Sequence, residues 1–456
     1  MVTATHSPPP TSHRAPAVAH RRSPAAPLLA AAWAGGLAVL GLWWADTASV
    51  VGTAGWLNGA GRITGLLCGY MCALLVVLMA RIPWLERGVG SDRTARWHAS
   101  AGRWTVGLLL AHMVLITLGY AAQAHDNAVR EFLTITLDLP EMLKGTLGAA
   151  ILLTVGFVSA RAVRRRMRYE TWYYLHLLTY AAIFLAFWHQ LALGADFVGN
   201  AAARSAWYAL YVGAAALVLW FRVLVPVRLN LRHRLRVEVV VPEAPGVHSV
   251  WVRGRHLDEL GARPGQFFRW RFLTQGLWAA SHPYSLSAVP RPDLLRITVK
   301  SLGDHSAAVP TVARGTRVWA EGPYGALTAD RRRRRKVLLL AGGTGITPLR
   351  TLFETLPAEP GDLTLLYRAR SAEELALRRE LKAIADRRGA RLLYALNAPD
   401  GTRTPLTADR LRATLPDIAE HDVFLCGPRE LSVAAYDALR AAGVPASRIH
   451  HESFEF

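Results

Sequence analysis

Six long apolar runs in the first half of the chain constrain its fold more than any other feature. They span roughly residues 28–45, 62–81, 97–120, 143–160, 170–191 and 205–225. A helix needs about 20 apolar residues to cross the roughly 30 Å hydrocarbon layer of a bilayer, and each run is close to that length. The sequence therefore predicts an all-α bundle of six membrane-spanning helices in contact with membrane lipid.

The connectors between these runs differ in charge. Arginines gather before the first run, between the second and third, between the fourth and fifth, and after the sixth, whereas the connector 121–142 carries four carboxylates and Arg130. Positive loops stay on the cytoplasmic side, so we expect both termini in the cytoplasm and a multi-pass protein of the plasma membrane. This topology also explains the formal net charge of +20, and we expect no nucleic-acid binding.

The regions outside the bundle differ from it in composition. Residues 1–27 are rich in Pro, Ala, Ser and His, which predicts a disordered cytoplasmic tail ahead of a membrane domain at 28–225. Short β-branched and aromatic segments separated by Pro and Gly predict an antiparallel β-barrel domain at 229–330. Alternating strands and helices predict an α/β Rossmann-like domain at 335–456.

Four histidines lie inside the apolar runs. His98 and His112 are in the third run and His176 and His189 are in the fifth. Ionisable side chains are costly inside a bilayer and indicate function by default. The two helices run in the same direction, so His98 should meet His176 near the cytoplasmic side and His112 should meet His189 near the outer side. Two imidazoles facing each other in this way are typical of a bis-histidine haem site, and the sequence predicts two b-type haems.

Two features of these runs leave alternatives open. His176 and His189 are 13 residues apart, which places them about 140° apart around a straight helix, so we expect a local distortion of the fifth helix. Arg62, at the outer end of the second run, is either an interfacial anchor or a positive charge beside the outer haem, where it would hold a propionate or draw in an anionic acceptor.

Motifs in the β-rich region predict a site for a flat ring with a phosphate group. "HPYSLS" (His282, Pro283, Tyr284, Ser285, Leu286, Ser287) can lay Tyr284 along a ring and present two serine hydroxyls to its polar edges. "ITVKSLGDHS" follows, and its Lys300 comes before the start of a predicted helix. Backbone amides at a helix start and a nearby lysine can bind an anion. We therefore expect a site suited to a pyrophosphate, formed by Val299, Lys300, Gly303 and Ser306.

The last region contains motifs typical of dinucleotide binding. "GGTGITP" follows a predicted strand, and its Gly342, Gly343, Thr344, Gly345 and Thr347 would let a diphosphate approach the backbone. Arg368 and Arg370 end the next strand, where an acidic residue would favour NAD, so NADPH is favoured over NADH. "CGP" (Cys426, Gly427, Pro428) would place Cys426 near the nicotinamide, unless this cysteine is only a small buried residue.

Together these motifs resemble the ferric reductase and NADPH oxidase superfamily, from about residue 28 to the end of the chain. Its members join a six-helix haem domain to a ferredoxin-reductase-type module for FAD and NAD(P)H. The resemblance implies that His98 and His176 ligate the inner haem, and that His112 and His189 ligate the outer haem. It also implies that a terminal aromatic residue, here Phe454 or Phe456, covers the flavin ring until nicotinamide displaces it.

The resemblance implies a transmembrane oxidoreductase that passes electrons from NADPH through FAD and two haems to an acceptor at the outer face. Ferric chelates are the favoured acceptor. Superoxide production from oxygen is the first competing hypothesis, although Ile116 stands where oxygen-reducing members often have a second histidine. A second is an electron-transfer subunit that feeds a protein partner, for which no docking segment is evident. A third is a transporter or receptor with a degenerate redox module.

Overall fold

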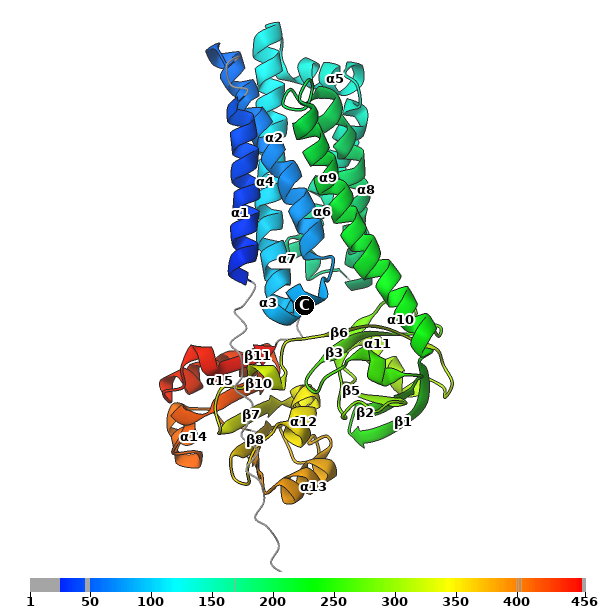
Figure 1. Cartoon of the computed structure of the whole chain (residues 1–456), viewed down its shortest axis with the longest axis vertical. Helices are drawn as coiled ribbons and strands as arrows, with labels where there is room; N and C mark the ends of the chain where they lie inside the picture. The colour runs from blue at the N-terminus through cyan, green and yellow to red at the C-terminus, as the bar shows by residue number, and fades with distance from the viewer. Residues whose placement is uncertain are drawn as a thin grey trace, which may run out of the picture.

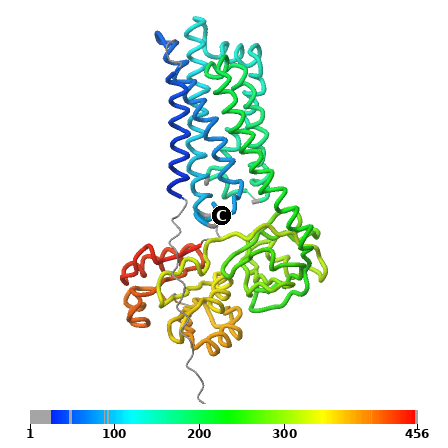
Figure 2. The backbone as a smooth tube through the Cα atoms, viewed as in Figure 1, coloured from blue at the N-terminus to red at the C-terminus, as the bar shows by residue number. Residues whose placement is uncertain are grey.

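The computed structural model describes residues 25–45, 50–167, 169–398, 400, 402 and 404–452. Most of the predicted tail and both terminal phenylalanines, Phe454 and Phe456, lie outside these residues. The last three residues of the predicted tail begin the first helix, α1 (Ala25–Ala45). A helical bundle stands on two sheet-containing domains, and the chain passes from one part to the next in order (Figures 1 and 2).

Six helices in the described residues are long and apolar enough to cross a membrane, which confirms the predicted bundle. Besides α1 they are α2 (Gly52–Leu78), α4 (Ser91–Ala124), α6 (Met142–Ser159), α8 (Tyr169–Leu193) and α9 (Ala201–Val218). The last helix continues through a π-helix, η1 (Leu219–Leu224), into α10 (Val225–His233), and so reaches the next domain. The α-helix of α8 is continuous, so the expected distortion does not interrupt it.

Three short helices connect the long ones: α3 (Pro83–Val89), α5 (Ala128–Asp138) and α7 (Arg161–Arg164). Asn127 caps α5, because its side chain accepts a hydrogen bond from the backbone N–H of Arg130. Val129, Leu133 and Leu137 recur every fourth residue and are exposed on one face of this helix. A membrane–water interface accommodates such an apolar face, and α5 lies at the end of the bundle away from the sheets (Figure 1).

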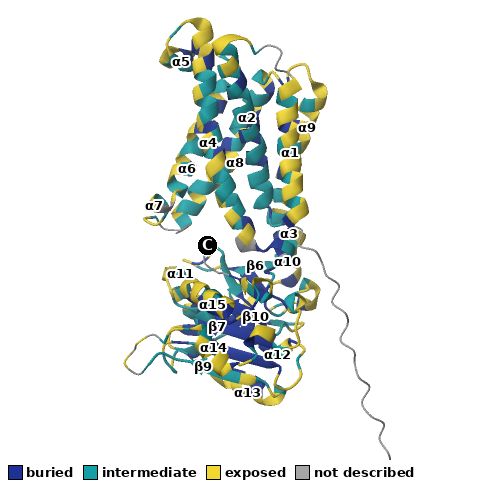
Figure 3. Cartoon of the chain, turned by 90° about the vertical axis from the view of Figure 1, so that its left-hand side faces the viewer, coloured by how far each residue is buried: buried dark blue, intermediate teal, exposed yellow. Residues whose placement is uncertain are grey.

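Side-chain burial separates the two halves of the molecule. The central strands β7 (Val337–Gly342) and β10 (Asp422–Cys426) of the sheet-containing half are buried, whereas much of the bundle surface is intermediate or exposed (Figure 3). Large exposed apolar side chains such as Trp33, Leu110 and Phe184 are common on the spans. A bundle surface of this kind is suited to lipid, where exposed apolar groups carry no penalty.

The β-rich domain contains two antiparallel sheets of three strands each, in the orders β1-β2-β5 and β4-β3-β6. Their bounds are Arg236–Ala244, Val247–Arg253, Phe267–Phe272, His282–Ser285, Leu294–Lys300 and Val318–Tyr324 for β1 to β6. Isolated antiparallel bridges join the two sheets along both edges. Leu286, just after β4, pairs with Ile297 of β5, and Arg236 of β1 pairs with Arg317, just before β6. The fully buried Phe268, Trp270 and Ile297 contribute to the core between them.

The last domain is a five-stranded parallel sheet in the order β11-β10-β7-β8-β9. Its strands are β7 (Val337–Gly342), β8 (Leu363–Arg368), β9 (Arg391–Ala395), β10 (Asp422–Cys426) and β11 (Ile449–Glu452). Helices α12 (Ile346–Thr355) and α13 (Arg378–Arg388) contribute to one hydrophobic core, and α14 (Ala408–Thr414) and α15 (Arg429–Ala441) to another. This is the predicted Rossmann-like α/β arrangement, in which ligands bind at the carboxyl ends of the strands.

Candidate electron-transfer site

The four membrane histidines form two pairs between α4 and α8. The ring centroids of His98 and His176 are 6.0 Å apart, and those of His112 and His189 are 6.5 Å apart. Two imidazoles bound to one metal through Nε2 would have centroids roughly 6 Å apart, since a metal–imidazole bond is about 2 Å. The ring planes meet at 71° in the first pair and 31° in the second, so the two pairs differ in the relative orientation of their rings.

Hydrogen bonds at Nδ1 select the tautomer that can bind a metal. His98 Nδ1 is 3.2 Å from the carbonyl oxygen of Leu75, and His112 Nδ1 is 2.8 Å from that of Gly61. A carbonyl only accepts, so each Nδ1 carries the proton and each Nε2 keeps its lone pair for a ligand bond. Both carbonyls come from α2, which packs along α4.

Glycines make room for the histidine rings. A Cβ on Gly65 would lie 2.6 Å from His112 Nδ1, and a Cβ on Gly145 would lie 2.8 Å from His189 Nδ1. Any side chain at either position would displace an imidazole. The distances, the tautomers and these glycines all fit a haem held by each histidine pair.

Arg62 lies beside the outer pair and is bound to an aspartate. Its Nη2 is 2.7 Å from Asp196 Oδ1 and its Nε is 3.3 Å from Oδ2, and the Asp196 side chain is only 2% exposed. The ion pair joins α2 to the segment after α8, next to the Gly61 carbonyl that holds His112. Asp196 compensates the charge of Arg62, so the structural role is favoured over attraction of an anion.

The predicted ring-binding residues lie on β4 and just after it. Tyr284 pairs with Phe268 of β3, and its carbonyl accepts a hydrogen bond from Trp270 Nε1 at 3.0 Å. Burial raises the pKa of the Tyr284 phenol well above its usual range. Ser285 Oγ is buried without a hydrogen-bond partner among the described residues. A buried hydroxyl of this kind is costly, which is consistent with a polar ligand at this strand.

His282 of the same motif packs on a second histidine. Its ring centroid is 3.8 Å from that of His305, at the predicted pyrophosphate site. Burial lowers the pKa of His282 to about 4, and His305 and Arg269 lower it further than Glu170 raises it. His305 lies in the first turn of the short helix that follows Gly303. Ser306 Oγ accepts a hydrogen bond of 3.1 Å from the backbone N–H of Gly303. The two halves of the predicted flavin site are therefore adjacent.

The two nicotinamide motifs meet at the carboxyl ends of β7 and β10. Gly343 has φ +53°, and a Cβ on Gly345 would collide with the Cys426 carbonyl, so "GGTG" and "CGP" pack backbone to backbone. The Thr347 hydroxyl donates to the Thr344 carbonyl at 2.9 Å and so closes the turn. Cys426 is fully buried, and burial raises the pKa of its thiol. The thiol is therefore not a nucleophile.

The two arginines predicted to favour NADPH already have protein partners. Arg368 donates to the Thr404 carbonyl. Arg370 is mostly exposed, and its Nε lies 3.6 Å from Glu374 Oε1. Glu374 also lies 3.8 Å from Lys300 Nζ, so this carboxylate, unnoticed in the sequence, stands between the predicted pyrophosphate and 2′-phosphate positions.

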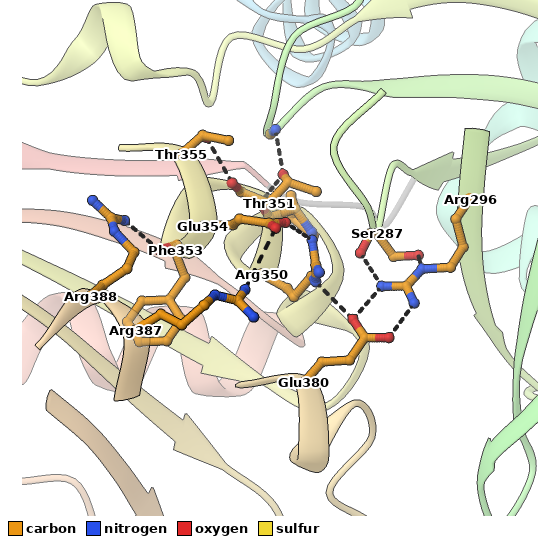
Figure 4. A network of polar contacts seen from close by, with 12 residues as sticks. Ser287, Arg296, Arg350, Thr351, Phe353, Glu354, Thr355, Glu380, Arg387 and Arg388 are labelled. Carbon is orange, nitrogen blue, oxygen red and sulfur yellow. Dashed lines mark hydrogen bonds and ion pairs between the residues drawn. The ribbon is translucent and has the colours of Figure 1, made fainter. Parts of the chain in front are cut away.

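A polar network joins the flavin motif to the nicotinamide domain (Figure 4). Arg296 of β5 is 2% exposed and donates to Ser287 Oγ at 3.1 Å. The same guanidinium donates to both carboxylate oxygens of Glu380, at 2.5 and 2.8 Å. Arg350 of α12 also donates to Glu380, at 3.0 Å, and to Glu354. The sequence motifs did not reveal this network.

Among the described residues, several hydrogen bonds and an ion pair join the bundle and its α10 extension to the β-rich domain that carries the predicted flavin motif. Arg81 binds Glu321 of β6, with 3.1 Å between Nη1 and Oε2. The Asn230 side chain exchanges two hydrogen bonds of 2.8 Å with the backbone of Ala320. Tyr174, near the start of α8, donates to the Ala279 carbonyl at 2.8 Å, three residues before the flavin motif. The end of α8 that carries His176 therefore faces the predicted flavin site.

Comparison with known families accounts for both halves of the molecule. Residues 64–187 match the family described as "Ferric reductase like transmembrane component", and residues 339–436 match "Oxidoreductase NAD-binding domain". The first match contains three of the four membrane histidines, and His189 lies two residues past its end. The second match contains both nicotinamide motifs. Together the two matches support the resemblance to the ferric reductase and NADPH oxidase superfamily. The two matched regions fit an NAD(P)H-linked flavin oxidoreductase that also has a membrane-spanning domain.

Curated relatives match about half of the chain. The ferredoxin reductase component of 3-ketosteroid-9-alpha-monooxygenase from Rhodococcus rhodochrous is 28% identical over 229 residues, which are 48% of this chain and 64% of the relative. The corresponding protein of Mycolicibacterium smegmatis is 33% identical, over 43% of this chain and 57% of the relative. A flavohemoprotein of Xylella fastidiosa is 31% identical, over 42% and 50%. The chain thus spans roughly half to two thirds of the length of these relatives.

Solved structures are similar at a lower level. The flavohemoglobin of Malassezia yamatoensis is 19% identical and covers 89% of this chain and 99% of its own, with a TM-score of 0.47. The ferredoxin reductase in carbazole 1,9a-dioxygenase is 22% identical and covers 49% and 69%, with a TM-score of 0.42.

Proposed function

We propose that this chain carries electrons from NADPH across the plasma membrane to a ferric chelate at the outer face. The observation that carries the proposal is that imidazoles of α4 and α8 face each other at two levels of one membrane bundle. Their ring centroids are 6.0 Å apart at one level and 6.5 Å apart at the other. When bound, FAD accepts hydride from the nicotinamide and releases single electrons, which two haems pass across the bilayer.

The protein's own part is to hold these groups in line. His98 with His176 would ligate an inner haem, and His112 with His189 an outer one. Val299, Lys300, Gly303 and Ser306 would surround the FAD pyrophosphate, while Pro283 and Tyr284 would lie along its ring. Gly342, Gly343, Gly345, Gly427 and Pro428 would hold the dinucleotide, with Arg368 and Arg370 toward a 2′-phosphate. Phe454 or Phe456, outside the described residues, would cover the flavin.

The surroundings of the outer pair favour a ferric chelate over oxygen as the acceptor. Ile116, one turn after His112, packs against Gly61 of α2, where a Cβ would lie 2.7 Å from its side chain. An apolar residue in that position offers no hydrogen bond to reduced oxygen. A protein acceptor is the second candidate, because two of the relatives are ferredoxin reductase components of a monooxygenase.

The test uses the purified full chain with haem, FAD and NADPH. We expect a reduced-minus-oxidised spectrum of b-type haem, and His112→Ala should lose about half of it. His125→Asn is the control, because His125 lies outside the bundle core at φ +53°, which asparagine tolerates. A colourless protein, or an unchanged spectrum for His112→Ala, would refute the proposal.

The acceptor is tested in the same preparation. Iron(II) formation from a ferric chelate that persists without oxygen supports the proposal. Dye reduction that is abolished by superoxide dismutase would instead indicate oxygen as the acceptor. Negligible turnover with either small molecule, restored by a partner protein, would indicate the second candidate.

A further inference from the structure

The Nδ1 atom of His176 lies near a side-chain hydroxyl, not a backbone carbonyl. His176 Nδ1 lies 3.4 Å from Ser159 Oγ, at the end of α6. Ser159 Oγ also accepts a hydrogen bond from Trp172 Nε1 at 3.2 Å. By contrast, His98 and His112 use main-chain carbonyls that no substitution removes.

The indole of Trp172 also fixes the plane of the histidine ring. Its centroid lies 5.1 Å from that of His176, with the rings 26° from parallel. The Arg164 guanidinium lies over the same indole, 4.1 Å from its centroid. Because Trp172 is one helical turn before His176, it stands on the side that faces the flavin domain, near the Tyr174–Ala279 contact.

We propose that Ser159 and Trp172 are positioning residues that set the tautomer, ring plane and donor strength of His176 as the inner haem ligand. This rests on the proposed function. A serine hydroxyl has two lone pairs, which accommodate the indole N–H and the Nδ1–H of a neutral imidazole together. With its proton held at Nδ1, His176 presents Nε2 to the iron.

The direction of the effect follows from charge. An acceptor at Nδ1–H increases electron density on the imidazole, and a more basic ligand favours the ferric iron. Ser159 therefore lowers the potential of the inner haem relative to an unsupported imidazole. Such a setting would favour onward transfer to the outer haem once the flavin has delivered an electron.

The test is a redox titration of both haems in the purified full chain, with electron paramagnetic resonance spectra of the ferric state. Ser159→Ala should shift the reduction equilibrium of one haem about tenfold toward the ferrous form, which is about 59 mV for one electron. The other haem should keep its midpoint. Trp172→Ala should broaden the ferric signal of that same haem, because the ring plane is no longer fixed.

Three variants keep the test specific. Ser159→Thr retains the hydroxyl and should restore the wild-type midpoint. Trp172→Phe retains the aromatic face and should keep a narrow signal. Thr179→Val removes a hydrogen bond of 2.7 Å to the His176 carbonyl, not to its ring, and should leave both midpoints unchanged.

Two results would overturn the inference while leaving the proposed function intact. One is a wild-type protein with two haems whose midpoints and signals do not change in Ser159→Ala and Trp172→Ala. The other is an equal shift of both haems, which would show a general disturbance of the bundle. Absence of haem from the wild type would instead remove the proposed function and this inference together.

Discussion

At the scale of single residues, His282 shows how neighbours decide whether a side chain carries charge. Burial, His305 and Arg269 hold its pKa at about 4, so the ring is neutral near pH 7. An unfolded chain would bind the proton at its ordinary value of 6.5. The stability that His282 contributes is therefore complete above pH 6.5 and is lost as the pH falls from 6.5 toward 4.

The same residue should couple FAD binding to proton uptake. A pyrophosphate beside His282 would raise its pKa, so binding near pH 6 should take up a proton, and FAD affinity should increase as the pH falls toward that value. Titration calorimetry in two buffers of different ionisation enthalpy measures the uptake. His282→Gln should abolish it, whereas His256→Gln, at an exposed loop histidine, should not. Equal uptake in both variants would contradict the assignment.

Sequence patterns predicted site residues whose chemistry is unusual for their surroundings. They did not reveal the common polar residues that form hydrogen bonds or ion pairs with those site residues. The membrane histidines stand out because a polar ring inside an apolar run needs a reason. Asp196 and Ser159 do not stand out, since an aspartate in a loop and a serine at a helix end are common. Their roles depend on how α2, α6 and α8 are rotated against one another, and no local pattern encodes that rotation.

At the scale of elements, the long helices were predictable and their ends were not. The structure has six spans where six apolar runs were expected, but the sixth continues to His233, eight residues past its predicted end. The segment Val225–His233 is polar and helical, and the Asn230 bonds to Ala320 anchor it on β6. The helix α5 was predicted as part of a connector, because 11 residues are too few to stand out from a loop.

The close packing of α2 on α4 gives a prediction for this helix pair. Gly65→Ala should displace the His112 ring, because the new Cβ would lie 2.6 Å from Nδ1. We expect loss of about half of the haem absorbance, with the inner site retained. Gly107→Ala on α4 is the matched control, since nothing lies within 4 Å of its Cβ. If both variants bind haem like the wild type, the outer ligand assignment is wrong.

At the scale of the whole molecule, the proposed electron transfer requires the three domains to keep fixed positions relative to one another. The bundle contacts the flavin domain through Arg81 and Glu321, and through Tyr174 and the Ala279 carbonyl. The flavin and nicotinamide domains are joined by Arg296 and Glu380. The motifs predicted each domain separately, but these contacts join residues 84 to 240 positions apart, beyond the reach of any local pattern.

The Arg296–Glu380 contact therefore gives a prediction about hydride transfer. Burial alone would raise the pKa of Glu380, but Arg296 and Arg350 hold it below its ordinary 4.5. The carboxylate thus stabilises the domain contact above pH 4.5 and ceases to do so as the pH falls further. Glu380→Gln would leave Arg296, buried beside Ser287 of the flavin motif, without its anion. We expect a loss of about 1–2 kcal/mol, reduced because the carboxylate is partly exposed.

Looser contact between the domains should slow flavin reduction by NADPH in a stopped-flow experiment by roughly tenfold, since about 1.4 kcal/mol corresponds to one factor of ten. Glu354→Gln is the matched control: Glu354 belongs to the same network, and its ion pairs among the described residues are with Arg350 and Arg387 of its own domain. It should lose comparable thermal stability and keep the wild-type rate. Equal slowing in both variants would show that the network stabilises the nicotinamide domain alone, because of these two glutamates it is Glu380 that pairs with Arg296 of β5.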